Sequence, residues 1–457
     1  MNGIRRRGIS FGTVFMLLMT IAVAGACAVV LPRLAGNMGQ GVDAQQLANA
    51  ITSSLDLPEL SLSDIPIFPQ IANKGHTTAV PTGVLSAEGV GTAQVVLQTP
   101  APTVTPAQAQ STFTLTVAGT VAFDSNIRKS SYYSESKTYD YRVPFALLGH
   151  EFGSDLNVVT LENTLVDNGK LNDINVTADV LAGLASAGLD MLALGHEHIL
   201  DLGFEGLNKT VAAVRNAGFS ILGVQPEKQE TQSALIVNLH GVQVGFLHYA
   251  DVMSNAGKRA IKADDCAFAV PAYQEEKVAA DIAAARRQGA HVVIVLIHWG
   301  SDGLSKVTHD QQVMAQAIAD AGADILLGTH NEVVLPIVYL TGNRPDGTKR
   351  PTLVCYSLGA LLTGSRESSA KLAGMLLHLQ IKFDMTSGMV DFEKVEYTPT
   401  YIWRYRENGR YVYQVIASNK AAPDNMDTKQ RDVMERALER VNKQMADSPA
   451  KLRVAGN

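Results

Sequence analysis

Four segments of the chain repeat one pattern of hydrophobic and polar positions. Each begins with hydrophobic residues at helical spacing, continues through a glycine that can end a helix in the left-handed conformation, and finishes with a short apolar run. The apolar runs do not alternate with polar residues, which is typical of strands covered by helices on both faces of a sheet. The pattern therefore predicts an α/β fold built in layers. The four helix and strand pairs are 178–188 with 190–194, 204–218 with 220–224, 275–289 with 291–297, and 311–322 with 324–327.

Two other pairs of apolar segments predict antiparallel hairpins. Residues 234–239 and 242–249 flank His240 and Gly241, which suit a two-residue turn. Residues 376–383 and 389–397 flank a second turn that ends at Gly388. Because hairpins add antiparallel strands to the repeated units, the sheet is expected to be mixed and doubled.

Composition sets the size and class of the folded part. With 457 residues, of which 46% are hydrophobic, the chain can bury a full core, and its net charge of −6 leaves no excess of basic residues for nucleic acid. The folded domain is expected to open at the strand 112–119 and to occupy residues 111–400, followed by a C-terminal extension, 401–457, with a charged surface helix at 428–445. Cys266 and Cys355 are predicted to be buried free thiols.

The N-terminal part predicts a membrane anchor and a tether. Residues 1–8 carry three consecutive arginines, and residues 9–31 contain no charge, which is about the 20 apolar residues that span a bilayer. The arginines should stay cytoplasmic, so that the protein is a single-pass protein of the cell membrane with its main domain extracytoplasmic. Residues 32–110 are rich in Gly, Ser, Thr, Gln and Pro and are expected to form an extended linker. Small residues at 24–26 leave cleavage by a signal peptidase as the alternative.

Histidines follow three of the predicted strands. They lie in the segments Gly195-His196-Glu197-His198, His298-Trp299-Gly300 and Gly328-Thr329-His330-Asn331-Glu332. In open α/β sheets, ligands bind outside the carboxyl ends of the strands, so side chains that arrive there from different strands can converge on one metal ion or substrate.

The order of these motifs resembles the CapA-type poly-γ-glutamate capsule synthesis family, whose domain is related to the calcineurin-like metallophosphatases. The resemblance covers about residues 113–383 and implies a layered metallophosphatase-like fold, with mixed β-sheets flanked by helices. It is carried by Gly119-Thr120, Thr160-Leu161-Glu162, His196-Glu197-His198 with Asp201 and Gly203, His298-Trp299-Gly300, Gly328 to Glu332, and Tyr356-Ser357-Leu358-Gly359-Ala360.

The resemblance also implies roles for individual residues. In the parent superfamily two divalent metals, bridged by a carboxylate, activate a hydroxide that attacks phosphorus while a histidine protonates the leaving group. This chain departs from the pattern at four positions. Thr120 replaces an aspartate, Glu197 replaces a metal-binding asparagine, and Thr329 and Glu332 each replace a histidine. Threonine is a poor substitute for these ligands, whereas glutamate remains a competent one.

The implied site therefore holds at most one divalent ion, manganese, zinc or iron. His198 and Glu197 are the implied catalytic residues. The implied metal ligands are Glu162, Glu197, His298, His330 and Glu332, and the implied substrate-binding residues are His196, Trp299 and Asp201. Several alternatives stay open. His196 can be a further metal ligand or can donate a hydrogen bond to one of the ligands. Trp299 can belong to the core, and Asp201 can shape a turn. Asp124 is a candidate for the missing carboxylate, and His248 is a candidate neighbour of the site.

Two functions remain open on the sequence. The first is a membrane-anchored, extracytoplasmic CapA-like protein of capsule or cell-envelope polymer synthesis, of the poly-γ-glutamate type, with metal-dependent hydrolase or transferase chemistry. The second is a non-catalytic binding or scaffold subunit on a degenerate metallophosphatase fold. Thr120 and Thr329 favour the second function. The first is favoured by the retained Glu162, His198, His298 and His330. In both cases the expected partners are an anionic envelope polymer or capsule synthase subunits, the membrane through the N-terminal helix, and no nucleic acid.

Overall fold

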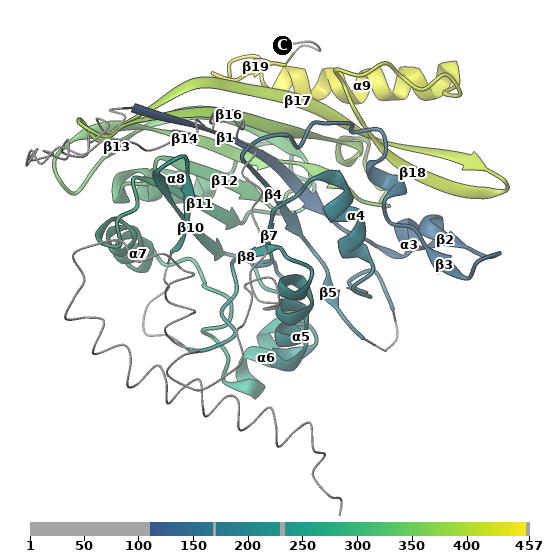
Figure 1. The fold of residues 1–457 in the computed structure, drawn as a ribbon, viewed down its shortest axis with the longest axis horizontal. Helices are drawn as coiled ribbons and strands as arrows, with labels where there is room; N and C mark the ends of the chain where they lie inside the picture. Colours follow the sequence, from purple (N-terminus) through teal and green to yellow (C-terminus); the bar gives the residue numbers. More distant parts are fainter. Residues whose placement is uncertain (1–109, 168–170, 229–233, 454–457) are drawn as a thin grey trace, which may run out of the picture. The chain divides into compact units, whose positions relative to one another are not determined.

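Two β-sheets face each other across a hydrophobic core, and helices cover their outer faces (Figure 1). The structure is a computed structural model that describes residues 110–167, 171–228 and 234–453. All of these residues belong to one compact unit. The predicted α/β fold in layers, with mixed sheets, is confirmed.

The first sheet has nine strands. Along it the order is β18, β17, β16, β1, β4, β7, β8, with β15 added beside β1 and β19 beside β17. The strands β1, β4, β7 and β8 are parallel, whereas β16, β17 and β18 are antiparallel to their neighbours. Their bounds are β1 Gln110–Val121, β4 Leu156–Leu161, β7 Met191–Ala193, β8 Ser220–Leu222, β15 Ala360–Leu362, β16 Ala373–Asp384, β17 Met389–Glu407, β18 Arg410–Ala417 and β19 Lys451–Leu452.

The second sheet has six strands in the order β13, β14, β12, β11, β10, β9. Its four central strands are parallel, and β9 and β13 run antiparallel at the two edges. The predicted hairpin turn between β9 and β10 is present, with positive φ at both His240 (53°) and Gly241 (86°). The bounds are β9 Leu235–Leu239, β10 Val242–Ala250, β11 Val292–His298, β12 Ile325–Thr329, β13 Val334–Asn343 and β14 Lys349–Leu358.

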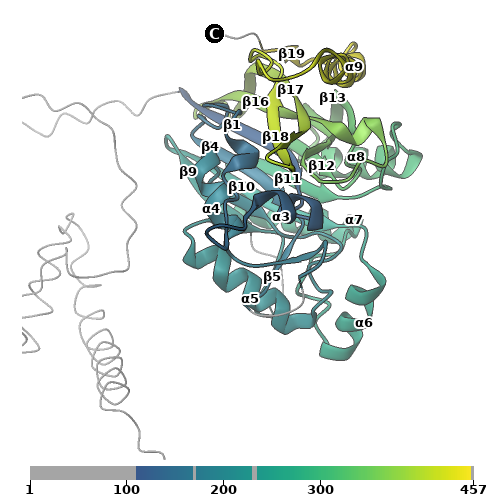
Figure 2. The same cartoon turned by 90° about the vertical axis from the view of Figure 1, so that its right-hand side faces the viewer.

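The helices cover the outer faces of both sheets (Figure 2). Two of them, α4 and α5, pack on the nine-stranded sheet, and α7 and α8 pack on the six-stranded sheet. Each of the four predicted helix, glycine and strand units is present, with Gly188, Gly218, Gly289 and Gly322 at positive φ after the helix. The helices are α3 Ser125–Ser131, α4 Val180–Ala187, α5 Gly203–Asn216, α6 Asn255–Asp264, α7 Glu275–Arg287, α8 His309–Ala321 and α9 Thr428–Gln444. Short elements complete the fold: η2 Val143–Phe145, η3 Ser369–Leu372, β2 Tyr132–Tyr133 with β3 Thr138–Tyr139, and β5 Thr164–Leu165 with β6 Asn175–Val176.

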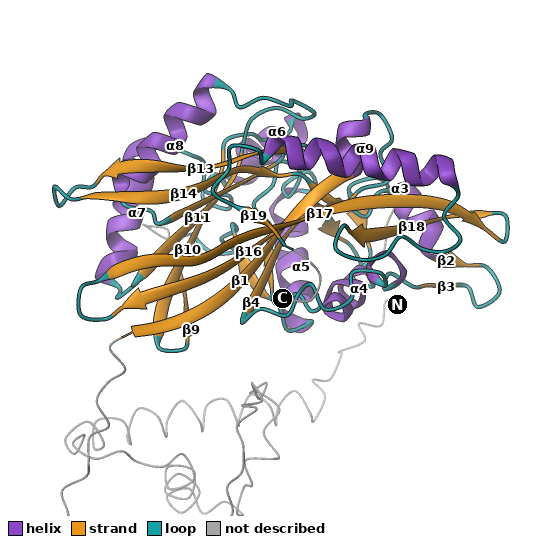
Figure 3. Ribbon diagram, turned by 90° about the horizontal axis from the view of Figure 1, so that it is seen from above, coloured by secondary structure: helices purple, strands orange, loops and turns teal. Residues whose placement is uncertain are grey.

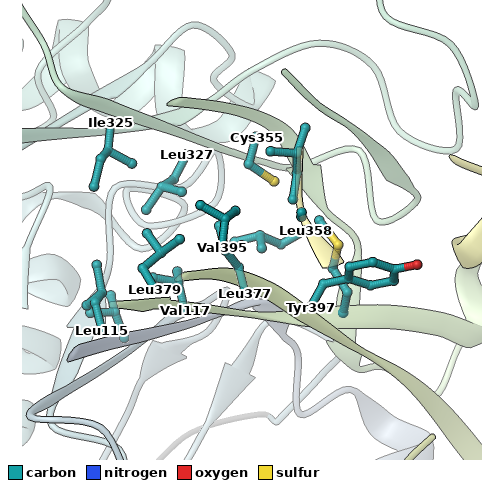
Figure 4. Packing of buried hydrophobic residues seen from close by; sticks show 14 of the residues in the cluster. Leu115, Val117, Ile325, Leu327, Cys355, Leu358, Leu377, Leu379, Val395 and Tyr397 are labelled. Atoms are coloured by element: carbon teal, nitrogen blue, oxygen red, sulfur yellow. The ribbon is translucent and has the colours of Figure 1, made fainter. Parts of the chain in front are cut away.

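Aliphatic side chains from both sheets fill the space between them (Figure 4). Leu115 and Val117 of β1 and Leu377 of β16 belong to the same cluster as Ile325 and Leu327 of β12, and all five are at most 1% exposed. Full burial of such a side chain is worth about 1.5–3 kcal/mol. The core therefore fixes the two sheets against each other, and with them the strand ends that carry the histidines.

Two family motifs meet where β1 passes the loop after β14. A Cβ atom on Gly119 would lie 1.8 Å from the carbonyl oxygen of Gly359, and the backbone N–H of Thr120 donates to that oxygen at 3.1 Å. Only glycine permits this approach of two backbones. Gly119 and the segment 356–360 are thus structural parts of the site, because they hold Thr120 in place.

The C-terminal part belongs to the main sheet. The boundary that we expected at residue 400 falls inside β17, whose second half pairs with β18 over Thr400 to Glu407. The charged helix α9 packs on β17, β16 and β13 and buries Met434, Ala437 and Val441 (Figure 3). Residues 401–453 are therefore integral to the domain, since their backbone completes the nine-stranded sheet.

The predicted stub 1–8, anchor 9–31 and all but the last residue of the linker 32–110 lie outside the described residues. Within the part of the chain that the structure describes, no helix is both long and apolar enough to cross a membrane. Cys266 and Cys355 are free and buried, as predicted.

Candidate functional site

The carboxyl ends of strands from both sheets meet at one edge of the domain. Glu162 follows β4, the segment His196 to His198 follows β7, His298 is the last residue of β11, and His330 follows β12. Parallel strands bring their carboxyl ends to the same edge of a sheet, and the packing of the two sheets brings these edges together.

Three of these residues form a compact group of possible metal ligands. Glu162, His298 and His330 each offer one ligand atom, and these atoms lie within 4.8 Å of one another. Glu162 Oε1 is 3.7 Å from His298 Nδ1, and the ring centroids of His298 and His330 are 4.6 Å apart. His298 is fully buried, whereas the side chain of Glu162 is 14% exposed toward the pocket. The group thus joins a buried imidazole to a carboxylate that solvent can reach.

The electrostatics of the group favour a bound cation. Burial and the nearby charge of Glu332 raise the pKa of Glu162 to about 8, although a hydrogen bond from Thr120 opposes this shift. Burial and the neighbouring His330 hold the pKa of His298 far below its usual range, and burial also lowers the pKa of His330. His298 Nε2 is buried without a hydrogen-bond partner among the described residues. Two neutral imidazoles and a carboxylate are a common ligand set for zinc, manganese or iron, so these residues fit one divalent ion.

The two threonines that the resemblance places at metal-ligand positions contact Glu162 and His298. Thr120 Oγ1 donates to Glu162 Oε1 at 3.1 Å. Thr329 Oγ1 lies 3.4 Å from both His298 Nδ1 and the carbonyl oxygen of Ile297. The hydroxyl groups of Thr120 and Thr329 therefore help to position Glu162 and His298.

His198 is held between two carboxylates. Its Nδ1 is 2.8 Å from Asp201 Oδ2, and its Nε2 is 3.2 Å from Glu197 Oε1. Hydrogen bonds to Asp201 and Glu197 raise the pKa of His198 to about 10, against the opposing effect of burial. The imidazole is thus protonated at neutral pH. Asp201 also accepts a hydrogen bond from Ser254 Oγ, which fixes the carboxylate behind His198.

The predicted substrate-binding residues do not line the pocket. Trp299 is fully buried, donates through Nε1 to the carbonyl oxygen of Tyr356 at 3.0 Å and stacks on the Tyr356 ring. His196 is also fully buried, and its Nδ1 accepts from the backbone N–H of His198. Asp201 contacts His198 instead of the cavity. These three residues support the site from behind, because the turns after β7 and β11 direct them into the protein.

Other expected residues are engaged elsewhere. Glu197 pairs with His198 and is not part of the compact group. Glu332 lies in the pocket wall but forms an ion pair with Lys371 at 2.8 Å. Asp124 caps helix α3 through the backbone N–H groups of Asn126 and Ile127 and also accepts from Gly364, so its oxygens are already used. His248 is buried against Gly195 and Gly223 beneath the site.

The loop after β12 has an unusual backbone. His330 has φ of 87° and Glu332 has φ of 54°, a region that costs a residue other than glycine about 1–3 kcal/mol. The buried Asn331 between them donates to the carbonyl oxygen of Ser301 and accepts from Gln311 Nε2. Such strain clusters at functional sites, and here it places both His330 and Glu332 in the pocket wall.

The pocket has a volume of about 600 Å³ and a predominantly acidic wall. Sequence reasoning missed several of its residues, because none lies in a motif or at a predicted strand end; among them Asp302, Arg366 and Lys371 carry charge. Carboxylates outnumber the cationic side chains, so the pocket is suited to bind a cation. The wall is formed by Asp124, Ser125, Asn126, Glu162, Asp173, Ile174, Glu197, His198, Asp302, His330, Glu332, Ser365, Arg366, Glu367 and Lys371.

Fold and site together define an α/β protein of two facing sheets, with a group of acidic residues and histidines at the strand ends. The family model described as "Bacterial capsule synthesis protein PGA_cap" matches residues 114–365, more than half of the 457 residues. The chain belongs to this family, which confirms the resemblance to CapA-type proteins.

Relatives of known name match less than half of the chain. The chain is 26% identical over 187 residues to "Capsule biosynthesis protein CapA" of Bacillus anthracis, covering 41% of this chain and 43% of that protein. It is 26% identical over 214 residues to "PGA biosynthesis protein CapA" of Bacillus subtilis (strain 168), covering 45% and 51%. A "probable polyglutamine synthesis accessory protein" of Mycobacterium tuberculosis (strain CDC 1551 / Oshkosh) is 26% identical over 201 residues, covering 41% and 53%. The matches thus span about half the length of these relatives.

Solved structures matched to this chain have low sequence identities and low TM-scores. The calcineurin-like phosphoesterase YfkN from Bacillus subtilis is 12% identical with a TM-score of 0.36, covering 73% of this chain and 99% of that chain. A putative 5'-nucleotidase from Staphylococcus aureus is 10% identical with a TM-score of 0.37, covering 72% and 58%.

Proposed function

We propose that this protein is a membrane-anchored, extracytoplasmic accessory protein of capsule or cell-envelope polymer synthesis, with a single divalent metal ion in its pocket. Membership of the capsule synthesis family supports the process. The names of two relatives, which refer to PGA biosynthesis and to polyglutamine synthesis, support a polymer of the poly-γ-glutamate type. The observation that carries the metal proposal is the convergence of Glu162, His298 and His330 within 4.8 Å. Its partners are then the anionic polymer and the subunits of its synthase.

Different side chains of the pocket would bind the metal ion and donate a proton. A divalent ion held by Glu162, His298 and His330 would supply Lewis-acid activation of an anionic group. His198 is protonated at neutral pH and lines the same cavity, so it can donate a proton to a leaving group as a general acid. Asp201 orients the imidazole through Nδ1, and Glu197 binds Nε2 until a substrate displaces it. This arrangement supports a hydrolase or transferase acting on the polymer.

A non-catalytic binding or scaffold subunit is the second candidate. It is favoured by Thr120 and Thr329, which stand at two ligand positions and bind other ligands instead. It is also favoured by the ion pair that occupies Glu332. Metal content separates the two functions, because a scaffold needs no ion at these residues.

The full chain, purified in detergent without chelator, is expected to contain about one equivalent of manganese, zinc or iron. The expected stoichiometry follows from the single compact group of ligands. Inductively coupled plasma mass spectrometry measures it, with protein treated with chelator as the control. Protein that contains no metal and takes up none when manganese or zinc is added would favour the scaffold function.

Protease added to intact cells is expected to degrade the bulk of the chain. The reason is the arginine cluster before the uncharged stretch 9–31, which should stay on the cytoplasmic side. A reporter fused before residue 9 should remain protected in the same cells. If the main domain also survives until the cells are lysed, the extracytoplasmic assignment is wrong.

A further inference from the structure

Lys371 lies almost buried in the wall of the acidic pocket. It belongs to η3, and only 6% of its side chain is exposed. Its Nζ is 2.6 Å from Asp302 Oδ2, 2.8 Å from Glu332 Oε2 and 3.8 Å from Glu367 Oε2. A nearly buried ammonium ion is tolerated when it is paired in this way. Of the three carboxylates, only that of Glu332 is itself mostly buried, with 15% of the side chain exposed, and it needs a cation for the same reason.

The lysine pairs with a carboxylate that the resemblance to CapA-type proteins implies as a metal ligand. That carboxylate belongs to Glu332, yet the compact group contains Glu162, His298 and His330 without it. Glu332 is nevertheless close to that group, because it lies two residues after His330 and lines the same pocket as Glu162 and His330. Lys371 and Glu332 therefore occupy the part of the pocket next to the compact group.

The other cationic side chains of the pocket wall are held by other groups. His198 is paired with Glu197 and Asp201. The guanidinium group of Arg366 lies over the ring of Tyr413 at 5.0 Å and donates to the carbonyl oxygen of Ile402 at 3.1 Å. Among the described residues it forms no ion pair with a carboxylate of the pocket. Lys371 is therefore the cation that neutralises this side of the cavity.

We propose that the ammonium group of Lys371 takes the place of the second divalent ion, so that the pocket is built to hold one ion only. The proposal rests on the metal-binding function proposed above, and it assigns a positioning role to Lys371. The three losses at residues 120, 329 and 332 are explained together, because a cation fixed to the chain needs no ligands of its own. Asp302 and Glu332 then hold the ammonium group as they would hold an ion.

The test is a calorimetric titration of the chelator-treated full chain with Mn²⁺ alone. Wild-type protein is expected to bind one Mn²⁺, and Lys371→Arg should also bind one because the charge is kept. Lys371→Met removes the charge and leaves Asp302, Glu332 and Glu367 for an ion, so it should bind a second Mn²⁺. Lys382→Met, which removes a lysine paired with Asp391 and Glu393 outside the pocket, is the matched control and should bind one. A Lys371→Met protein that is folded by circular dichroism and binds Mn²⁺ as the wild type does would overturn the proposal.

A second variant keeps the proposal testable if Lys371→Met does not fold. Glu332→Gln is expected to change the affinity for the first Mn²⁺ by less than about threefold, because Glu332 is engaged by Lys371, whereas Glu162→Gln should lower it by at least tenfold. Equal losses in these two variants would make Glu332 a ligand and contradict the role of Lys371. If the proposed metal-binding function is wrong, wild-type protein binds no Mn²⁺. In that case the role of Lys371 is supported only if Lys371→Met binds one Mn²⁺ ion.

Discussion

Replacement of His298 by alanine is expected to weaken metal binding by about 100-fold or more and to leave the free energy of unfolding of the metal-free protein nearly unchanged. Loss of residues that merely support a ligand costs about 10–100-fold in affinity, so loss of a ligand should cost at least as much. The fold should tolerate the change because the imidazole is desolvated and its Nε2 has no hydrogen-bond partner among the described residues. Calorimetric titration with Zn²⁺ or Mn²⁺ and urea unfolding of the same preparation measure the two quantities.

Val295→Ala is the matched control for this variant. Val295 lies in the same strand, β11, is fully buried and belongs to the core under α7 and α8. Its truncation should lower the free energy of unfolding by about 1–3 kcal/mol through lost burial and a partly unfilled cavity, while metal binding is retained. If His298→Ala destabilises the protein as much as Val295→Ala and binds metal normally, His298 is a structural residue.

Asp324→Ala is expected to lower the free energy of unfolding by about 3 kcal/mol or more. Asp324 lies next to the start of β12 and is almost completely buried. Its carboxylate accepts from Arg286 at 2.6 Å, from Arg344 at 3.0 Å and from the backbone N–H of Val293 at 2.8 Å. Removal of one partner from a buried ion pair costs about 3–5 kcal/mol, and we expect the lower end because Arg286 is partly exposed. Urea unfolding monitored by circular dichroism measures the loss.

An exposed aspartate provides the comparison. Asp432 lies on the solvent side of α9, and its replacement by alanine should change the free energy of unfolding by no more than about 0.5 kcal/mol. A loss below 1 kcal/mol for Asp324→Ala would mean that water replaces the carboxylate between the two arginines. In that case the base of β12 does not depend on this ion network.

The local part of the fold could be predicted from the sequence. Helix, glycine and strand units leave their pattern within about 20 residues, as in 311–327, where Gly322 ends α8 and β12 follows. The extent of β17 could not be predicted in this way. Its second half is a strand because β18 pairs with it. The local pattern of hydrophobic and polar residues does not specify such pairing between segments.

Some residues of the candidate site could likewise be predicted from the sequence, and others could not. His298 and His330 could be placed together because each lies at the end of a parallel strand, and parallel strands end at a common edge. Glu162 could be placed with them only through the resemblance to the CapA-type family. The burial of Trp299 depends on which way a turn directs one side chain, and periodicity does not specify this. Lys371 was missed for another reason. It lies in a short 3₁₀ helix, and the conformation of the segment before β16 brings it to the pocket.

The reactivity of the two buried thiols, Cys266 and Cys355, can be used to measure opening of the native domain. Cys355 lies in β14 within the core between the sheets, and burial raises its pKa, so that it reacts with a thiol reagent only when the sheets separate. Cys266 lies just after α6, in the cluster on the outer face of the nine-stranded sheet, where a smaller local motion can expose it. Different labelling rates at Cys266 and Cys355 would therefore distinguish local opening at the outer face from separation of the two sheets, without any engineered label.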